Sequence, residues 1–301
     1  MSGRAGPGRP RAGRANCQLL GTVAQPSVPG RVVEASLPHP RDFEKIVSAF
    51  AKMSIFTITI EFGEAGMHLY GVAEPQPHSS EPTALLVTIP ASAMARYYCS
   101  AAPRLICISR TNLAELCNCI AAGHQFANLY FHDDMKELCF ELCSATARST
   151  LRCIITPAVV GRLPREIPPE QYDCVWRSNN FRDMPLTALP TGVNETVVIR
   201  CSQSPHLSVE FCTKSATPSA SNTSTMFEPP GTLRADLFLH VEYSCAPFLA
   251  TLHLARTHSV SFRHAENLPL LVVGDPSANA SDLLSCCYFR IEAPLHRPVP
   301  L

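Results

Sequence analysis

One local pattern occurs four times in this sequence: a stretch with helical periodicity, followed by two short alternating strands joined by a turn. The helical stretches begin, at intervals of 69, 69 and 64 residues, near Phe43, Asn112, Phe181 and Cys245. Any two half-buried hairpins share a period of two, so a match between one pair of units carries little weight. Four units in one order, each with its helix first, indicate duplication. We therefore predict an α+β fold built from one copied element.

The four units fall into two halves separated by a proline-rich segment. Units one and two, with further strand candidates between them, make a half over residues 39–157, and units three and four make another over 174–301. The segment between them, 158–173, ends in E-I-P-P-E-Q-Y-D. Its prolines keep the chain extended and outside either sheet. We predict two similar domains joined by an extended connector.

Composition excludes several classes of protein. Hydrophobic residues make up 46% of the chain, which is ample for a packed core. No segment has the ~18 uninterrupted apolar residues of a membrane span, and the first residues lack the apolar core of a signal peptide. We expect a soluble intracellular protein. The 14 cysteines include no paired C-x2-C modules, so we interpret them as small buried hydrophobic residues and predict no metal or other cofactor.

Charge is informative here only through its position. The formal net charge is zero, and 21 of the 25 basic residues are arginine, a bias that fits both phosphate contacts and a GC-rich genome. Residues 1–38 are basic and rich in Gly, Pro and Ala, so we predict a disordered tail. Within it G-P-G-R-P-R-A-G-R resembles the AT-hook, which would place Arg9, Arg11 and Arg14 in a minor groove. A plain basic tail, attracted to DNA by counterion release, fits the same residues.

Four segments resemble proliferating cell nuclear antigen, the family of DNA polymerase sliding clamps. They are I-P-P-E-Q-Y-D-C-V in the connector, T-V-V-I-R-C in the third unit, and N-L-P-L-L-V-V and C-Y-F-R-I-E-A-P-L near the end. The resemblance lies in their order and spacing over roughly residues 40–294. It implies sheets outside, helices on one inner face, and usually three subunits closing a ring around duplex DNA. The basic tail and the arginine bias suit a clamp encoded by a large DNA virus.

The resemblance also implies which side chains face DNA. Arg41, Lys45 and Lys52 fall within about 40° of one another on the first helix, opposite its apolar side. An ordinary solvent-exposed face fits the same residues, because surface helices usually carry charge on the side away from the core. Two prolines in the third helix, Pro185 and Pro190, make a full-length helix doubtful at that place. The candidates for DNA contact on the folded body are Arg41, Lys45, Lys52, Arg110, Arg177, Arg182, His253 and Arg256.

The family binds polymerase and other replication or repair proteins through a hydrophobic pocket under the connector, which receives a short aromatic-bearing peptide. The positions that match this pocket are Val72, Ile167, Pro168, Pro269, Tyr288 and Pro294. Residues 149–156 and 224–229 occupy the places of the strands at the subunit edges. The implied function is a homotrimeric processivity factor that acts in the nucleus, or at a cytoplasmic replication site if a virus encodes it.

Two other readings use the same sequence. His132-Asp133-Asp134 invites a catalytic interpretation, but the triplet falls at a hairpin turn, where Asp is favoured for backbone reasons. We find no P-loop, nucleophile elbow, H-E-x-x-H or dinucleotide motif, and predict that the chain is not an enzyme. The second reading stays within the clamp fold: a herpesvirus-type processivity factor that does not close, or one subunit of a checkpoint clamp.

Overall fold

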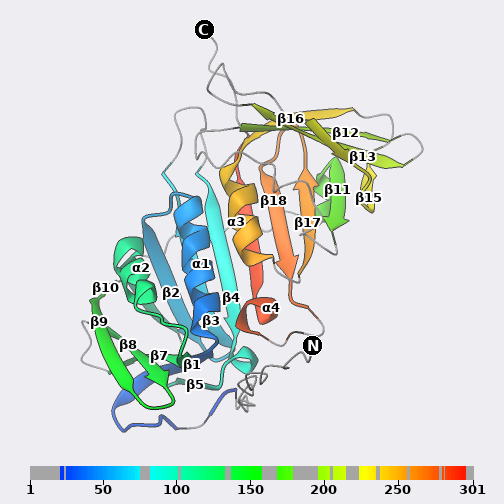
Figure 1. Cartoon of the computed structure of the whole chain (residues 1–301). Coiled ribbons are helices and arrows are strands. Elements are labelled where there is room, and N and C mark those ends of the chain that lie inside the picture. The colour runs from blue at the N-terminus through cyan, green and yellow to red at the C-terminus, as the bar shows by residue number, and fades with distance from the viewer. Residues whose placement is uncertain are drawn as a thin grey trace, which may run out of the picture.

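In the computed structural model the chain forms antiparallel sheets with helices laid against one side of them (Figure 1). The structure describes residues 21–23, 25–74, 82–100, 103–132, 137–157, 168–178, 196–203, 206–214, 224–234, 238–255, 258–277, 280 and 282–295. The first half contains β1 (Arg31–Pro38), α1 (Pro40–Lys52), β2 (Thr57–Gly63), β3 (Gly66–Val72), β4 (Ala84–Pro90), β5 (Arg96–Cys99), β6 (Arg104–Ser109), α2 (Arg110–Asn118), β7 (His124–His132), β8 (Glu137–Ser144), β9 (Arg148–Ile154) and β10 (Thr156–Pro157). The second half contains β11 (Cys174–Ser178), β12 (Thr196–Gln203), β13 (Leu207–Lys214), β14 (Ser224–Phe227), β15 (Gly231–Leu233), β16 (Leu239–Ser244), α3 (Ala246–Leu254), β17 (Ser259–His264), β18 (Leu270–Asp275), α4 (Leu283–Cys286) and β19 (Tyr288–Ala293).

The sheets repeat one arrangement of strands. Their orders are β5-β1-β7-β8-β9, β10-β6-β2-β3-β4-β19-β18-β17-β11-β15 and β14-β13-β12-β16. The order β5-β1-β7-β8-β9 reappears as β15-β11-β17-β18-β19, and the order β6-β2-β3-β4 reappears as β16-β12-β13-β14. The predicted α+β fold of two similar halves is therefore confirmed. The third helical stretch, 181–192, lies outside the described residues.

The two halves share one sheet through a single pair of strands. β4 of the first half pairs with β19 of the second, with Thr88 opposite Tyr288 and Ala84 opposite Glu292. The long central sheet is continuous because of this pair. The pairing thus shows how the end of one half recognises the end of the other.

α1 lies between α2 and α3 on one side of the central sheet (Figure 1). Its apolar residues Phe43, Ile46, Val47 and Phe50 recur at helical spacing and are all buried. Pro40 stands in the first turn, where its missing N–H is not needed. Within the described residues no helix is long and apolar enough to cross a membrane.

The predicted tail boundary at residue 38 is wrong. Arg31–Pro38 form β1, which lies between β5 and β7 in its sheet. Val33, Ala35 and Leu37 alternate along it and are fully buried, and this alternation was outweighed by the basic composition around it. Glu34 is also buried, because Arg31 (3.3 Å) and Arg96 (3.6 Å) surround its carboxylate. Residues 1–20 lie outside the described residues, so disorder there stays a prediction.

The core of the second half is built around Trp176, the only tryptophan of the chain. Its indole stacks on Phe262 at 4.1 Å between ring centroids, and its Nε1–H donates to His264 Nε2 at 3.0 Å. His264 is fully buried among aromatic rings. Burial lowers the pKa of His264 from 6.5 to about 3, because the protein interior solvates the charged imidazolium poorly.

This histidine makes stability depend on pH. The unfolded chain binds a proton at His264 near pH 6.5 and the folded chain only near pH 3, so protonation favours unfolding. The contribution of neutral His264 to the free energy of unfolding is complete above pH 6.5. It falls by about 1.4 kcal/mol for each pH unit as the pH drops from 6.5 towards 3. We expect His264→Gln, which can still accept from Trp176 but does not titrate, to flatten the urea-unfolding profile between pH 4 and 6.5. A profile parallel to that of the unsubstituted protein would contradict this assignment.

Candidate functional site

The helix side of the central sheet carries the first candidate site. Of the predicted DNA-facing residues on α1, Arg41 is exposed, whereas Lys45 and Lys52 are half-buried. Lys45 Nζ donates to the buried carboxylate of Asp42 at 2.8 Å. Lys45 is therefore largely neutralised by its own helix, and Arg41 and Lys52 are the α1 cations left to meet an outside phosphate.

The neighbouring helices add little positive charge. Arg110 begins α2, and its guanidinium lies 4.9 Å above the ring centroid of Phe56, which is 59% exposed. α3 is buried along most of its length, with only Leu252 and His253 half-buried. Burial lowers the pKa of His253, and the charge of Lys52 lowers it further, so the imidazole is neutral at pH 7. The cationic surface is thus narrower than the sequence predicts.

The structure does not bring Arg177 to the helix side. Arg177 follows Trp176 in β11, and successive side chains of a strand point to opposite faces. Because Trp176 is fully buried in the core, Arg177 lies on the outward face, where it is exposed. The other predicted cations, Arg182 and Arg256, and the tail arginines Arg9, Arg11 and Arg14, lie outside the described residues.

The predicted partner pocket is only partly brought together. Val72, 37% exposed, shares an outward row with Ala84 and Glu292. Pro294 lies two residues past Glu292, and Pro269 lies just before Leu270, which pairs with Ala293. These prolines and Val72 therefore stand at one end of the central sheet.

Tyr288 stands at the other end of β19. It lies four residues from Glu292, which corresponds to about 13 Å along a strand. It packs instead against the small outward cluster that includes Tyr172 and Val273. Pro168 is exposed at the end of the connector. Ile167 lies outside the described residues.

The ends of the sheets form a second candidate site. In the described part of the chain β9 pairs only with β8, and β14 pairs only with β13. Unpaired edge strands present a row of N–H and C=O groups that can pair with another strand. These strands overlap the segments 149–156 and 224–229, which the sequence indicates as subunit edges, so each half contributes one of these two edge strands.

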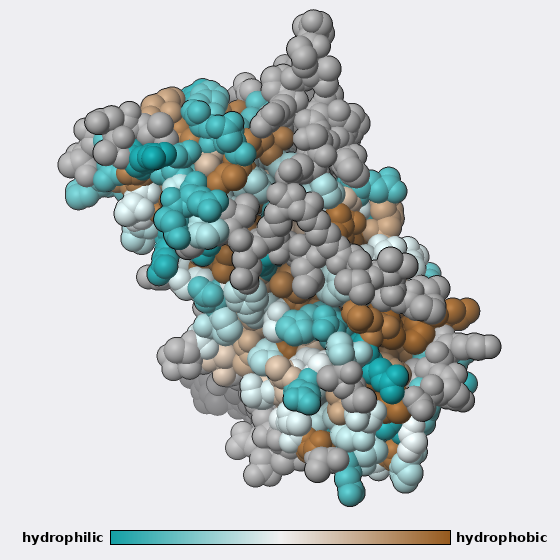
Figure 2. Space-filling model, turned by 180° about the vertical axis from the view of Figure 1, so that it is seen from behind, coloured by the Kyte–Doolittle hydropathy of each residue, from teal (hydrophilic) through white to brown (hydrophobic). Residues whose placement is uncertain are grey.

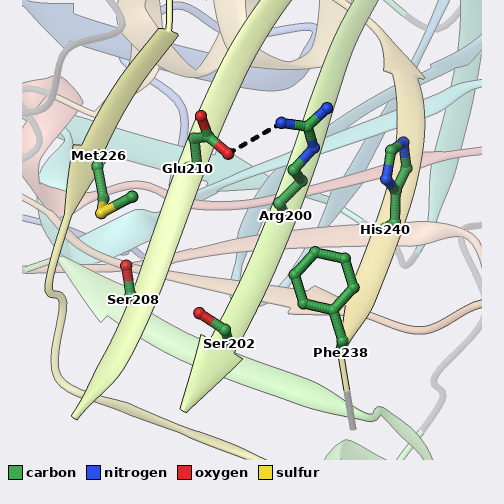
Figure 3. Close-up of a pocket in the computed structure, with 7 residues that line it drawn as sticks. All are labelled: Arg200, Ser202, Ser208, Glu210, Met226, Phe238 and His240. Atoms are coloured by element: carbon green, nitrogen blue, oxygen red, sulfur yellow. Dashed lines mark hydrogen bonds and ion pairs between the residues drawn. The ribbon is translucent and has the colours of Figure 1, made fainter. Parts of the chain in front are cut away.

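A groove of about 450 Å³ lies beside the β14 edge, on the outward face of the β14-β13-β12-β16 sheet. Its floor holds an ion pair, Arg200 Nη1 to Glu210 Oε2 at 3.2 Å (Figure 3). Met226 and Phe238 are 66% and 59% exposed. The lining residues are Arg200, Ser202, Ser208, Glu210, Met226, Phe238 and His240. Figure 2 shows the outward face of the molecule, where coloured hydrophobic and hydrophilic residues are interspersed.

Sequence reasoning did not identify this groove. Polar residues alternate with apolar ones in T-V-V-I-R-C-S-Q and L-S-V-E-F, which indicates one solvent-facing side. The alternation predicts a hairpin but does not specify which other strands lie beside it. The register that sets Arg200 opposite Glu210, and Glu210 opposite Met226, depends on strand pairing that no local pattern specifies.

The side chain of His132 makes contacts within the described part of the chain. His132 ends β7, with Nδ1 3.1 Å from the carbonyl oxygen of Gly30, and its ring meets Tyr130 edge-on. Asp133 and Asp134 lie outside the described residues. Among the described residues no group of three or more His, Cys, Asp and Glu side chains could hold a metal ion. The described cysteines are mostly buried or half-buried, and burial raises the pKa of Cys117 to about 12.

Duplicated halves, helices on one face and antiparallel sheets on the other define the α+β fold of the DNA sliding clamps. The chain is similar to the crystal structure of proliferating cellular nuclear antigen from Entamoeba histolytica, with a TM-score of 0.63, 14% identity, and coverage of 88% of this chain and 99% of that chain. It is similar also to the PCNA2–PCNA3 complex from Sulfolobus tokodaii, with a TM-score of 0.67, 11% identity, and coverage of 87% and 98%. No family model and no curated protein matches the sequence. At this identity the likeness shows the fold.

Proposed function

We propose that this chain is a subunit of a sliding clamp. Copies join end to end, three to a ring, with the helix side towards the hole and duplex DNA passing through it. The ring tethers a DNA polymerase and other replication or repair proteins to their template, and it performs no chemical reaction itself. Its place of action is the nucleus, or a cytoplasmic replication site if a virus encodes it.

One observation carries the proposal: among the edge strands of the described residues, β9 and β14 are the counterparts of the two strands already joined inside the chain. β4 corresponds to β14, and β19 corresponds to β9, by their places in the repeated strand orders. β4 and β19 form the antiparallel pair that links the halves. The same kind of antiparallel pair between β14 of one copy and β9 of the next would join the second half of one copy to the first half of the next, as β4 and β19 join the halves within one copy. Repetition of one rotation closes a ring when the rotation divides a full turn.

The helix side suits a weak grip on DNA. Arg41 and Lys52 can meet phosphates, while Lys45 is held by Asp42. Phosphate contacts carry no sequence information, so a few of them let a ring slide. A closed ring needs no tighter contact, because its topology keeps it on the duplex.

Partner proteins are proposed to dock at the end of the central sheet. Val72, Pro269 and Pro294 offer partly exposed apolar surface there, close to the row that contains Glu292. A short peptide with an aromatic side chain fits such a surface. The residues of the connector before Pro168 lie outside the described residues.

The function is tested by retention on linear duplex DNA whose two ends are blocked. Protein that encircles DNA stays on it in high salt, whereas protein held by charge is washed off. The same test separates the proposal from a processivity factor that does not close. Native mass measurement separates three identical subunits from a checkpoint clamp of different ones.

A more local prediction concerns α1. We expect Arg41→Gln with Lys52→Gln to lower the slope of log affinity against log salt by about 2, since each lost phosphate contact removes roughly 0.9. The matched control is Arg234→Gln, a 76% exposed arginine paired with Asp173 rather than placed on a helix. Binding to a duplex across a KCl series measures the slope. An equal slope in the double variant and the unsubstituted protein would show that another surface meets DNA.

A further inference from the structure

The junction inside the chain shows how outward side chains line up when two edges meet. One row crosses it: Glu61 of β2 lies opposite His68 of β3, His68 opposite Thr88 of β4, and Thr88 opposite Tyr288 of β19. Neighbours in this row interact, since His68 Nδ1 and Thr88 Oγ1 are 2.9 Å apart. The row therefore sets a template for side chains at the equivalent junction between copies.

The second half contains the first part of the equivalent row. Arg200 is the fifth residue of β12, as Glu61 is the fifth residue of β2. Arg200 lies opposite Glu210 of β13, and Glu210 lies opposite Met226 of β14. Met226 then takes the place of Thr88. The next position in the row lies beyond the free edge of β14, next to the groove.

The residue that fills this position comes from β9 of another copy. Tyr288 is the first residue of β19, and Arg148 is the first residue of β9. Both strands occupy the same place in the repeated order. We infer that Arg148 of the partner subunit lies beside Met226 and that its guanidinium reaches the carboxylate of Glu210, so that the groove receives the next subunit. This inference rests on the proposed joining of copies through β9 and β14.

The distances allow this contact. Neighbouring strands lie about 4.8 Å apart, so Glu210 is about 10 Å from the backbone of the partner subunit's β9. Extended Arg and Glu side chains together span that distance. Met226, 66% exposed, lies between the two strands and offers its thioether to the aliphatic stem of the arginine. The contact would cover apolar surface that a single copy leaves in water.

The charges are arranged to favour it. Glu210 is paired with Arg200 at 3.2 Å, and its side chain is 21% exposed. Arg148 of the partner subunit would approach from the opposite side, so that a carboxylate lies between two guanidinium groups. Arg148 is exposed in the single chain, which leaves it able to move towards a partner. Such a contact is partly solvated. It therefore affects the register and the salt dependence of assembly more than the overall affinity between subunits.

The test is a charge exchange measured by sedimentation equilibrium in low salt. We expect Arg148→Glu, and separately Glu210→Arg, to raise the subunit dissociation constant by about tenfold, because each places like charges at the junction. The double variant restores the opposite charges and is expected to return to within about threefold of the unsubstituted protein. Arg148→Glu changes an exposed side chain, so its effect does not depend on whether Glu210→Arg folds.

Glu64→Arg serves as the matched control, since it reverses one charge at the exposed turn between β2 and β3. It is expected to leave the dissociation constant unchanged. If the unsubstituted protein assembles and Arg148→Glu has no effect, or the double variant is no better than the singles, this contact is wrong and the proposed ring still stands. If the unsubstituted protein stays monomeric at tens of micromolar, both the ring and the contact are wrong.

Discussion

Protein threaded onto linear duplex DNA is expected to remain there through a wash at about 0.5 M salt when both ends carry streptavidin, and to leave after a single cut. The physical reason is that salt weakens phosphate contacts but does not open a closed ring. A protein making six to ten such contacts already loses a factor of about 10³ to 10⁵ in affinity between 50 and 200 mM salt. We therefore expect at least about tenfold more protein on blocked DNA than on cut DNA.

A matched variant separates topology from charge. The variant Arg41→Gln with Lys52→Gln is expected to have a lower salt slope of binding. It should nevertheless be retained on blocked DNA to the same extent as the unsubstituted protein, because neither side chain lies on β9 or β14. Equal loss of protein from blocked and cut DNA would rule out encirclement. The chain would then be better described as a processivity factor held by charge.

The repeat was predictable from sequence because it resides in local patterns. The structure shows a helix with an apolar stripe in α1 and an alternating strand in β12, and these periods are properties of neighbouring residues. Their order along the chain was enough to predict duplication, and the clamp fold was implied by the resemblance of four segments to the sliding clamps. The edge strands β9 and β14 also overlap segments that the sequence indicates.

The orientation of individual side chains was not predictable in the same way. Arg177 was counted as DNA-facing because it is basic and close to the third unit, but its neighbour Trp176 occupies the inward position of β11. Lys45 is predicted to face DNA, but its ammonium group donates to the buried carboxylate of Asp42. A one-residue change of register moves a side chain to the other face of a sheet, and composition does not specify register.

The N-terminal boundary shows a third kind of difference. Residues 31–38 were assigned to a disordered tail because arginine, glycine and proline surround them, yet Val33, Ala35 and Leu37 are buried in a central strand. The neighbouring strands β5 and β7, which lie far along the sequence, provide the surface that buries them. Tertiary pairing of this kind outweighs local composition.

The edge strand β14 is held in place through the aromatic core of the second half. Trp176 in the central sheet meets Phe211 of β13 edge-on, with 6.1 Å between ring centroids, and it stacks on Phe262. Phe262 in turn stacks on Phe248 of α3 at 6.1 Å. β13 is the strand that carries β14. One indole therefore links the central sheet, the outer sheet and a helix.

Trp176→Ala is expected to destabilise the protein by about 3–5 kcal/mol, the range for removing a large aromatic side chain from a core. The cost includes the transfer of the indole, the cavity that remains, and a buried acceptor on His264 that loses its donor. Trp176→Phe keeps much of the stacking on Phe262 but not the N–H, so we expect about 1–2 kcal/mol. Urea unfolding followed by far-ultraviolet circular dichroism measures these differences, because the tryptophan signal is lost in both variants.

The matched control is Phe56→Ala, which removes an aromatic ring that is 59% exposed and is expected to change stability by no more than about 0.5 kcal/mol. If Trp176→Ala costs as little as this control, the second half is not held together around the indole. If it costs the expected amount, assembly should weaken with it. The edge β14 is positioned through β13 and Phe211, so a loosened core no longer presents a fixed strand to the next copy.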